Sequence, residues 1–495
     1  MLPNFSRLFF AVSAALCFYA SARATDLLIE NVAIVSPERA QPSAKQFVLI
    51  RDGRIAQISA KPLPAAKNAT KLNGAGKFLT PGIMDAHVHL TTPPGLPMGT
   101  QDAALAPLIE AFNKQQPRSY LYFGVTQVLD TAHVGDGLEI FEAQPQHPDL
   151  FQCGAAPVLD GYPTVFIDPK IRYQVAPDYI FEPANAEAHP LPPGARQADH
   201  TPEAIVERIA ASGALCMKIF IEDGFGPDAD WPLISKDTLQ RIRAATRKRG
   251  LILVAHANAL DMQRMALDAQ VDVLAHGLWN WDEAADKPGI PPVIAAHLKR
   301  IHNSGTGYEP TLRVLAGTAD LFREDTLKDP TYAKVVPAAL LQWYGTDAGQ
   351  WYKRQMRQDY GNAPDARIAS IQLQVGEHGM RAVHYLQELG HPFLLGSDTP
   401  SSPTYGSQPG YDTYREMRLL AQSGVPLNAV FRAATLNNAR RFHLEKDYGT
   451  VAVGKVANLL LLEENPLQSL RAWSQIDKVI LRGTVIERES LAADR

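Results

Sequence analysis

Cysteine is scarce in this chain, with only three among 495 residues. Two of them, Cys153 and Cys216, lie beyond the N-terminal segment, and two cysteines cannot build the disulfide framework of a small secreted domain. Both lie in apolar, strand-like segments. We therefore expect both to be buried free thiols.

A marked excess of one charge is also missing. The chain has 48 Lys and Arg against 52 Asp and Glu, a formal net charge of −4. A protein that binds nucleic acid through electrostatic attraction needs a concentrated basic surface. We therefore expect no nucleic-acid partner.

Long apolar runs are absent beyond the first 24 residues. Within them, Arg7 precedes an apolar stretch at 8–20, and Ala22 and Ala24 supply the small residues of a cleavage site. This pattern is typical of a signal peptide cleaved after Ala24, and the stretch is too short to span about 30 Å of hydrocarbon. We expect export to the periplasm or the medium, without stable membrane insertion.

What the chain does contain is enough apolar sequence for a large core, with 46% hydrophobic residues. Between 79 and 445, apolar strand-like runs alternate with amphipathic helical stretches. This alternation predicts an α/β fold, a (β/α)8 TIM barrel. The eight runs are 81–90, 124–131, 152–160, 214–221, 251–256, 271–276, 305–312 and 392–398.

The two ends of the chain have a different pattern from the region between them. Residues 25–78 and 446–495 are rich in short strand-like runs, and they predict one small β-sandwich domain formed from both termini. Two long insertions, 162–200 and 316–390, interrupt the barrel pattern, and we expect the first to be an ordered loop over the barrel mouth. The second carries an aromatic group at 343–352 that suits either an apolar substrate or a contact between copies of the chain.

Histidines stand at the ends of several barrel runs. His87 and His89 are two residues apart on a predicted strand, so their side chains share one face. His256 and His276 each end an apolar run, and Asp398 ends the last one. Active sites of barrels assemble at the C-terminal ends of the strands. A His-x-His pair alone would also be compatible with core histidines.

Lys218 interrupts the apolar run ALCMKIFI. A lysine is almost never buried unpaired, because losing its hydration is costly. One interpretation is a salt bridge to a neighbouring strand end. The other is a carboxylated lysine whose carbamate bridges two metal ions. Four imidazoles, one carbamate and one aspartate would suit two divalent ions such as Zn²⁺.

These residues and their surroundings resemble the amidohydrolase superfamily, across nearly all of the chain beyond residue 24. The matching pieces are 81–89, 124–126, Lys218, 255–257, 275–277, 396–398, 434–439, 449–455 and 465–467. The branch that the chain resembles contains exported Xaa-Pro dipeptidases and imidazolonepropionase-related hydrolases. Asn258 stands where that branch usually has a tyrosine, and Gly161-Tyr162-Pro163 stands where it tends to have a Gly-Gly-His element. The groups that bind the ends of a dipeptide are therefore not visibly in place.

The resemblance implies a binuclear metal centre. It assigns His87, His89 and Asp398 to the more buried ion, His256 and His276 to the other ion, and carboxylated Lys218 to the bridge. A hydroxide shared by the two ions would attack an amide or peptide carbonyl. Asp398 would act as general base and then as general acid. Asp85 and Asp130 would either orient ligands or cap strand ends.

The substrate is expected to be a small molecule bound by loops at the barrel mouth. The candidates are His133, Tyr162, His302 and Tyr308, although each could equally serve packing alone. Alternatives to amide hydrolysis are ester or lactone hydrolysis, single-metal deamination and a non-catalytic binding module. Lys218 and the lack of a His-x-x-Glu motif after His276 count against deamination. The sequence does not determine the oligomeric state, and a homo-oligomer is one alternative.

Overall fold

The computed structural model describes residues 26–64, 66–100, 102–133, 135, 137–225, 230–401 and 403–494. The predicted signal peptide, residues 1–24, lies outside these ranges. Among the helices of the described part, none is both long and apolar enough to cross a membrane.

Seven parallel strands form the barrel sheet, in the order β12-β11-β10-β9-β8-β7-β6. They are β6 (Ile83–Val88), β7 (Val125–Asp130), β8 (Asp149–Ala155), β9 (Cys216–Phe220), β10 (Ile252–His256), β11 (Val273–Ala275) and β12 (Gly307–Glu309). All these strands except β8 are buried at every position. Continuous burial is typical of parallel strands that are covered on both faces.

The eighth predicted run, 392–398, closes the barrel as an extended segment between β12 and β6. The Leu394 amide donates to the Tyr308 carbonyl of β12 at 3.0 Å, and the Ala86 amide of β6 donates to the Leu395 carbonyl at 3.0 Å. The Asn438 side chain bonds Leu395 N at 3.1 Å and Leu395 O at 2.7 Å. Because this amide replaces regular ladder bonds, the segment is not a regular strand. The (β/α)8 prediction is confirmed.

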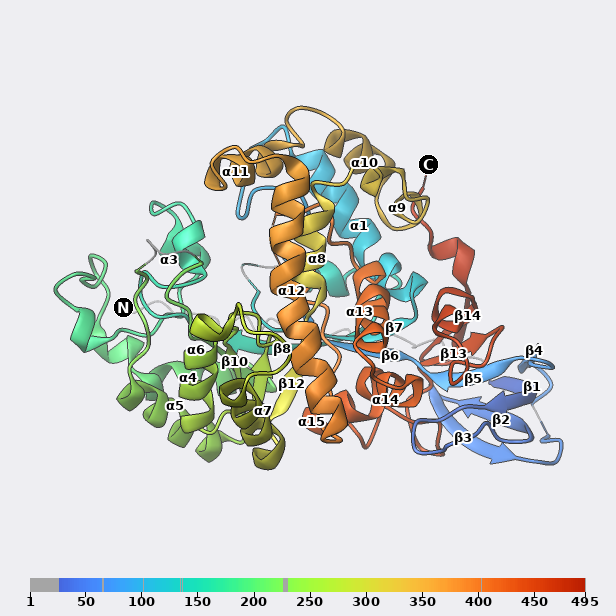
Figure 1. Cartoon of the computed structure of the whole chain (residues 1–495). Helices are drawn as coiled ribbons and strands as arrows, with labels where there is room; N and C mark the ends of the chain where they lie inside the picture. The colour runs from blue at the N-terminus through green and yellow to red at the C-terminus, as the bar shows by residue number, and fades with distance from the viewer. Residues whose placement is uncertain are drawn as a thin grey trace, which may run out of the picture.

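Helices surround the barrel sheet (Figure 1). They are α1 (Ala106–Tyr122), α2 (Gly137–Glu142), α3 (Arg172–Val175), α4 (Pro202–Ala211), α5 (Lys236–Arg249), α6 (Leu260–Asp268), α7 (Pro292–Ser304), α8 (Arg313–Asp320), α9 (Tyr332–Val335), α10 (Ala338–Tyr344), α11 (Trp351–Asp359), α12 (Asp365–Glu388), α13 (Tyr411–Gln422), α14 (Leu427–Arg432) and α15 (Asn438–Arg441). The sequence determines the ends of α5 clearly. Ser235 caps its first turn by accepting from Thr238 N at 3.2 Å. Gly250 ends it in the left-handed conformation, with φ of 69°.

Both ends of the chain build one further sheet. It contains β1 (Leu27–Ile34), β2 (Lys45–Arg51), β3 (Arg54–Ser59), β4 (Thr70–Asn73), β5 (Phe78–Pro81), β13 (Leu459–Leu462), β14 (Ile476–Leu481) and β15 (Thr484–Glu487). Antiparallel pairing of β13 with β5 joins the two ends. The predicted two-terminus β domain is thus a single eight-stranded mixed sheet, with one apolar cluster that draws on both its halves.

The expectation of free thiols is wrong. Cys153 and Cys216 form a disulfide. They lie opposite each other in the register of neighbouring strands β8 and β9, with Cα atoms 4.4 Å apart. Such a separation is within the range that a disulfide bridges. The bond therefore joins two adjacent barrel strands in the buried core.

The insertions are ordered in the described residues. Residues 162–200 form short helical turns and α3. In the second insertion, Tyr344 of α10 donates to the Pro94 carbonyl at 2.7 Å, and Trp351 of α11 donates to the Gly95 carbonyl at 2.8 Å. Helices α10 and α11 therefore pack on the loop that follows β6, and they form the upper edge of the view in Figure 1.

Candidate metal centre

His87, His89 and Asp398 meet at the C-terminal end of β6. Nε2 of His87 lies 3.2 Å and Nε2 of His89 lies 2.8 Å from the same carboxylate oxygen, Oδ1 of Asp398. The Asp398 amide also donates to the His87 carbonyl at 2.8 Å. The eighth segment is thereby held against β6, and one carboxylate is positioned between two imidazoles.

Lys218 reaches the same cluster from β9. Its Nζ lies 3.3 Å from Nε2 of His87, and the side chain is 1% exposed. Within the described ranges, no carboxylate lies at ion-pair distance from this ammonium group, so the salt-bridge interpretation is not supported. Burial lowers the pKa of Lys218 to about 8.

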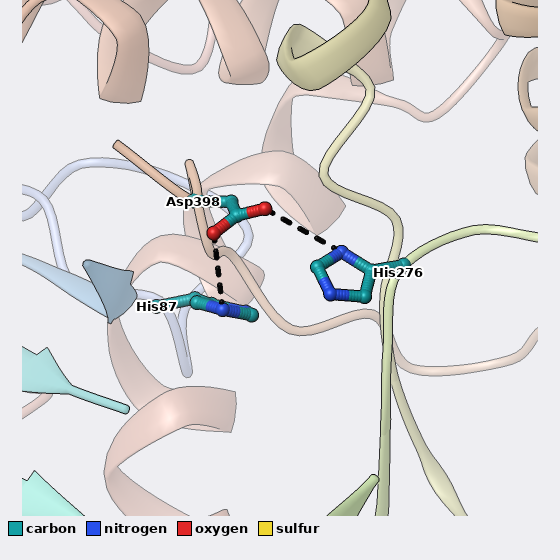
Figure 2. A group of neighbouring side chains, drawn as sticks. All are labelled: His87, His276 and Asp398. Carbon is teal, nitrogen blue, oxygen red and sulfur yellow. Dashed lines mark ion pairs between the residues drawn. The ribbon is translucent and has the colours of Figure 1, made fainter. Parts of the chain in front are cut away.

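His256 and His276 complete the group from β10 and β11. Their ring centroids are 4.4 Å apart, and the His276 ring is 5.1 Å from the His87 ring. Nδ1 of His276 lies 3.6 Å from Oδ2 of Asp398. Figure 2 shows the Asp398 carboxylate directing one oxygen toward each of the His87 and His276 rings.

The most compact candidate for one metal ion combines residues from both predicted sites. His87, His276 and Asp398 each offer a ligand atom within 4.8 Å of the others. All six predicted ligands thus lie in one contiguous buried cluster, with Asp398 at ion-pair distance from three of the four histidines.

The backbone is strained around this cluster. His276, Thr311 and Asp398 adopt positive φ angles of 92°, 43° and 55°. Non-glycine residues rarely adopt this conformation, which costs about 1–3 kcal/mol per residue and concentrates at functional sites. Oγ1 of Thr311 lies 2.9 Å from Nδ1 of His276, so two of the strained residues contact each other.

Burial favours the neutral form of three of the four imidazoles. Burial lowers the pKa of His87 and of His276 well below the usual value. Burial also lowers the pKa of His256, although Glu222 opposes the shift. Burial acts in the same direction on His89, but the hydrogen bond and charge of Asp398 outweigh it and raise that pKa. Neutral imidazole is the form that binds a metal ion.

Glu309 is a buried carboxyl that the sequence analysis missed. It is fully buried in β12, and neither oxygen has a hydrogen-bond partner among the described residues. Its Oε2 lies 3.4 Å from Nδ1 of His87, and burial raises its pKa to about 8. A charged residue inside the apolar run GYEPTL is the same signal that singled out Lys218.

Glu222 was also missed. It follows the run that contains Lys218 directly, and its Oε2 lies 3.1 Å from Nε2 of His256. Asn258, which replaces the tyrosine of the resembling branch, donates to the same oxygen at 3.1 Å. Asn258 therefore positions Glu222 against a candidate ligand.

Asp85 and Asp130 accept hydrogen bonds from backbone amides, and Asp130 also lies 3.9 Å from Nδ1 of His133. Asp85 accepts from the amides of Ser397 at 2.9 Å and His87 at 3.3 Å. Asp130 accepts from the Leu90 amide at 2.7 Å. Both carboxylates thus cap the segments that carry the candidate ligands.

Three of the four predicted substrate residues lie away from the cluster. His133 lines a cavity of about 160 Å³ with residues of α2 and β8, and none of the six candidate ligands lines it. His302 lies in α7, where its ring packs 6.0 Å from the His391 ring. Tyr308 is fully buried, and its hydroxyl accepts from Leu278 N at 2.7 Å. His302 and Tyr308 therefore serve packing, because their side chains contact the layer outside the barrel sheet.

Tyr162 lies at the cluster, within a larger aromatic group. This group, which we name the mouth cluster, consists of Tyr162, Phe166, Phe220, Phe225 and Trp231. The Tyr162 ring lies 4.6 Å from the His256 ring and stacks on Trp231 at 5.8 Å. Phe166 and Phe225 are 55% and 59% exposed. An aromatic surface thus extends from solvent to a candidate ligand.

Comparison with known proteins agrees with this architecture. Residues 339–486 match the model described as the Amidohydrolase family. No curated protein matches the chain.

A structure of a putative prolidase from Bifidobacterium longum is similar at 21% identity and a TM-score of 0.63, covering 96% of this chain and 97% of its own. A prolidase complexed with N-methylphosphonate-L-proline is similar at 19% identity and a TM-score of 0.66, covering 94% and 100%. Ochratoxinase from A. niger is similar at 18% identity and a TM-score of 0.63, covering 94% and 96%.

Residues 339–486 therefore match the amidohydrolase family, and the solved structures share the fold of nearly the whole chain. The match to the family model contains Asp398 and the segment 434–439. The four histidines and Lys218 precede it in the chain. At these identities the likeness to solved structures concerns the fold, so the chemistry of this chain must be argued from its own side chains.

Proposed function

We propose that this chain hydrolyses an amide or peptide C–N bond with two divalent metal ions of the Zn²⁺ type. The observation that carries the proposal is the convergence of four histidines, Lys218 and Asp398 in one buried cluster at the C-terminal ends of barrel strands. The buried imidazoles and the one carboxylate form the donor set that such ions prefer.

Bound ions of this kind supply a water of lowered pKa and polarise the carbonyl of the substrate. Asp398 is positioned to hold the proton of that water and to deliver it to the leaving nitrogen, because both its oxygens face the cluster. Lys218 would be carboxylated and bridge the ions. The lowered pKa of Lys218 supports this role, because the neutral amine is the form that reacts with carbon dioxide.

The substrate class follows from the mouth cluster. We propose that an aromatic or bulky apolar group of a small substrate packs on Phe166, Phe225 and Trp231, with the scissile bond directed past Tyr162 toward His256. Exposed aromatic rings beside a polar site are suited to such a group. The names of similar structures include prolidases and phenylurea hydrolase B, and these names agree with cleavage of C–N bonds.

Hydrolysis of matched substrate pairs tests both statements. We expect cleavage of N-benzoyl and N-acetyl amino acids, with a higher kcat/KM for the benzoyl series. Phe225→Ala should lower kcat/KM for the benzoyl series about 2- to 10-fold, as expected for one lost aromatic contact, and leave the acetyl series nearly unchanged. Val453→Ala, which truncates an exposed side chain in the loop before β13, is the control.

The outcomes separate the two statements. An equal loss on both series would contradict the aromatic subsite but not the amide hydrolase. Cleavage of aryl esters or lactones alone would contradict amide specificity, and release of ammonia from a purine or pyrimidine by a one-metal enzyme would favour deamination.

We propose further that the protein works outside the cytoplasm. The Cys153–Cys216 disulfide supports this proposal, because disulfides persist in oxidising compartments. Fractionation of cells followed by N-terminal sequencing of the mature chain tests it. A protein that keeps residues 1–24 and fractionates with the cytoplasm would contradict it.

A further inference from the structure

A second cavity lies at the opposite end of the barrel from the metal centre. It has a volume of about 550 Å³, within the usual range for small-molecule sites. Its lining includes Ile252, the first residue of β10, and Asp272, which precedes β11. The cavity is therefore at the N-terminal ends of the strands. Helices α5 and α15, which contribute to it, lie near the lower edge of Figure 1.

The lining of this cavity is strongly basic. Its charged side chains are Arg243, Arg247, Arg432, Arg440, Arg441 and one carboxylate, Asp272. Arg243 binds both oxygens of Asp272, at 2.6 and 3.0 Å, so this pair is neutral. The other four guanidinium groups have no carboxylate at ion-pair distance within the described ranges. We name these four the arginine quartet.

Neutral groups hold three members of the quartet in place. Arg247 donates to the Gln270 side chain at 2.6 Å, and Arg441 donates to the Gly305 carbonyl at 2.8 Å. Arg432 donates to the Pro37 carbonyl at 3.2 Å. None of these acceptors compensates a charge. Burial lowers the pKa of Arg441, although the charges of Asp272 and Glu309 oppose the shift.

We propose that the arginine quartet binds a small, multiply charged phosphate anion. Four like charges around one cavity repel each other unless an anion neutralises them. Guanidinium groups match phosphate oxygens through paired hydrogen bonds and bind them more strongly than neutral acceptors. A ligand with two phosphate groups would neutralise the quartet within the available volume. The site does not depend on the proposed hydrolase activity.

The expected consequence of binding is stabilisation of the barrel rather than competition with substrate. The N-terminal face of a barrel usually serves stability, whereas the opposite face carries catalysis. The quartet joins α5, α14 and α15, so an anion between them would link helices that are distant in the sequence. A ligand that binds the folded chain alone raises the melting temperature with its concentration.

Calorimetric titration of the metal-loaded full chain tests the proposal. The probes are fructose 1,6-bisphosphate, inorganic phosphate and chloride, at constant ionic strength. We expect one bisphosphate per chain, weaker binding of phosphate, no saturable binding of chloride, and a melting temperature that rises with bisphosphate. Arg440→Gln is the informative variant, because the Arg440 side chain is exposed and makes no hydrogen bond or ion pair with the other residues that the structure describes.

Arg440→Gln should weaken bisphosphate binding at least tenfold and abolish most of the thermal shift. The control is Arg300→Gln, which removes an exposed arginine paired with Asp268 outside the cavity and should change affinity less than twofold. Equal binding by wild type and Arg440→Gln would assign the anion to another site, such as the metal centre, and overturn the proposal. No saturable bisphosphate binding, or binding only to vesicles of anionic phospholipid, would also overturn it.

Discussion

Two titratable side chains, Lys218 and Glu309, are buried on either side of the His87 ring. Lys218 Nζ lies 3.3 Å from Nε2, and Glu309 Oε2 lies 3.4 Å from Nδ1. Where a carboxyl oxygen accepts from one ring nitrogen, the proton is fixed there and the lone pair stays on the other nitrogen. Glu309 would therefore direct the lone pair of His87 toward Lys218 and Asp398.

Replacing Glu309 tests this positioning role. Glu309→Leu should lower metal affinity about 10- to 100-fold, the usual effect of losing such a partner, while leaving the fold at least as stable because a buried, unpartnered carboxyl is removed. Glu309→Gln keeps an oxygen at the same position and should retain part of the affinity. Competition with a chromophoric chelator measures affinity without an activity assay. Unchanged affinity in Glu309→Leu would assign Glu309 no part in the metal centre.

Glu416 gives a pH prediction away from the candidate ligands. It is fully buried in α13 and accepts from the Arg313 amide at 2.8 Å, and burial raises its pKa from 4.5 to about 8. The folded chain therefore keeps a proton that the unfolded chain releases. This stabilisation is complete below pH 4.5 and is lost as the pH rises toward 8.

Glu416→Gln should remove this part of the pH dependence. The free energy of unfolding of the wild type should fall relative to the variant between pH 5 and 8, by up to about 1.4 kcal/mol per pH unit. Urea titrations at several pH values measure the difference. Parallel profiles for the two proteins would show that Glu416 titrates normally. The exposed Glu110→Gln serves as the control.

At the scale of elements, the disulfide shows why the pairing of neighbouring strands cannot be predicted from local sequence patterns. Each cysteine lies in an apolar run, which correctly indicates a buried strand. The pairing arises because β8 and β9 are adjacent in the sheet with Cys153 opposite Cys216. Register across 63 residues depends on how the whole barrel closes, and local patterns do not encode it.

Removing this link should destabilise the barrel. Replacing both Cys153 and Cys216 by alanine should lower the free energy of unfolding by about 2–4 kcal/mol, because the unfolded chain loses a long closed loop. Denaturant titration of the oxidised wild type, the reduced wild type and the double variant measures it. The reduced wild type should resemble the variant. Equal stability of all three forms would show that the bond does not form in solution.

The eight strand runs and the residues at their ends were predictable because burial and alternation are local signals. Which face of a fully buried strand points into the barrel is not local. Tyr308 was therefore assigned to the mouth although its side chain contacts the outer layer. His302, which was expected in a mouth loop, lies in α7. Glu309, the neighbour of Tyr308, points inward instead. The mouth cluster joins residues from 162 to 231, and this tertiary contact leaves no spacing pattern.

At the scale of the whole molecule, the barrel presents two different ends. The C-terminal ends of the strands carry the metal-ligand candidates and the mouth cluster, and the N-terminal ends carry the arginine quartet. The sheet built from both termini packs beside the barrel (Figure 1). Pairing of β5 with β13 holds the first and last parts of the chain together in this sheet, whereas residues 392–398 close the barrel.

The proposed function depends on a binuclear metal centre that is bridged through Lys218. Metal content by mass spectrometry, on protein produced with added zinc, tests it most directly in the wild type, Lys218→Ala and the exposed control Lys114→Ala. We expect about two metal ions per chain in the wild type and the control, and at most one in Lys218→Ala together with loss of amide hydrolysis. One ion or none in the wild type, or an unchanged content in Lys218→Ala, would contradict the claim.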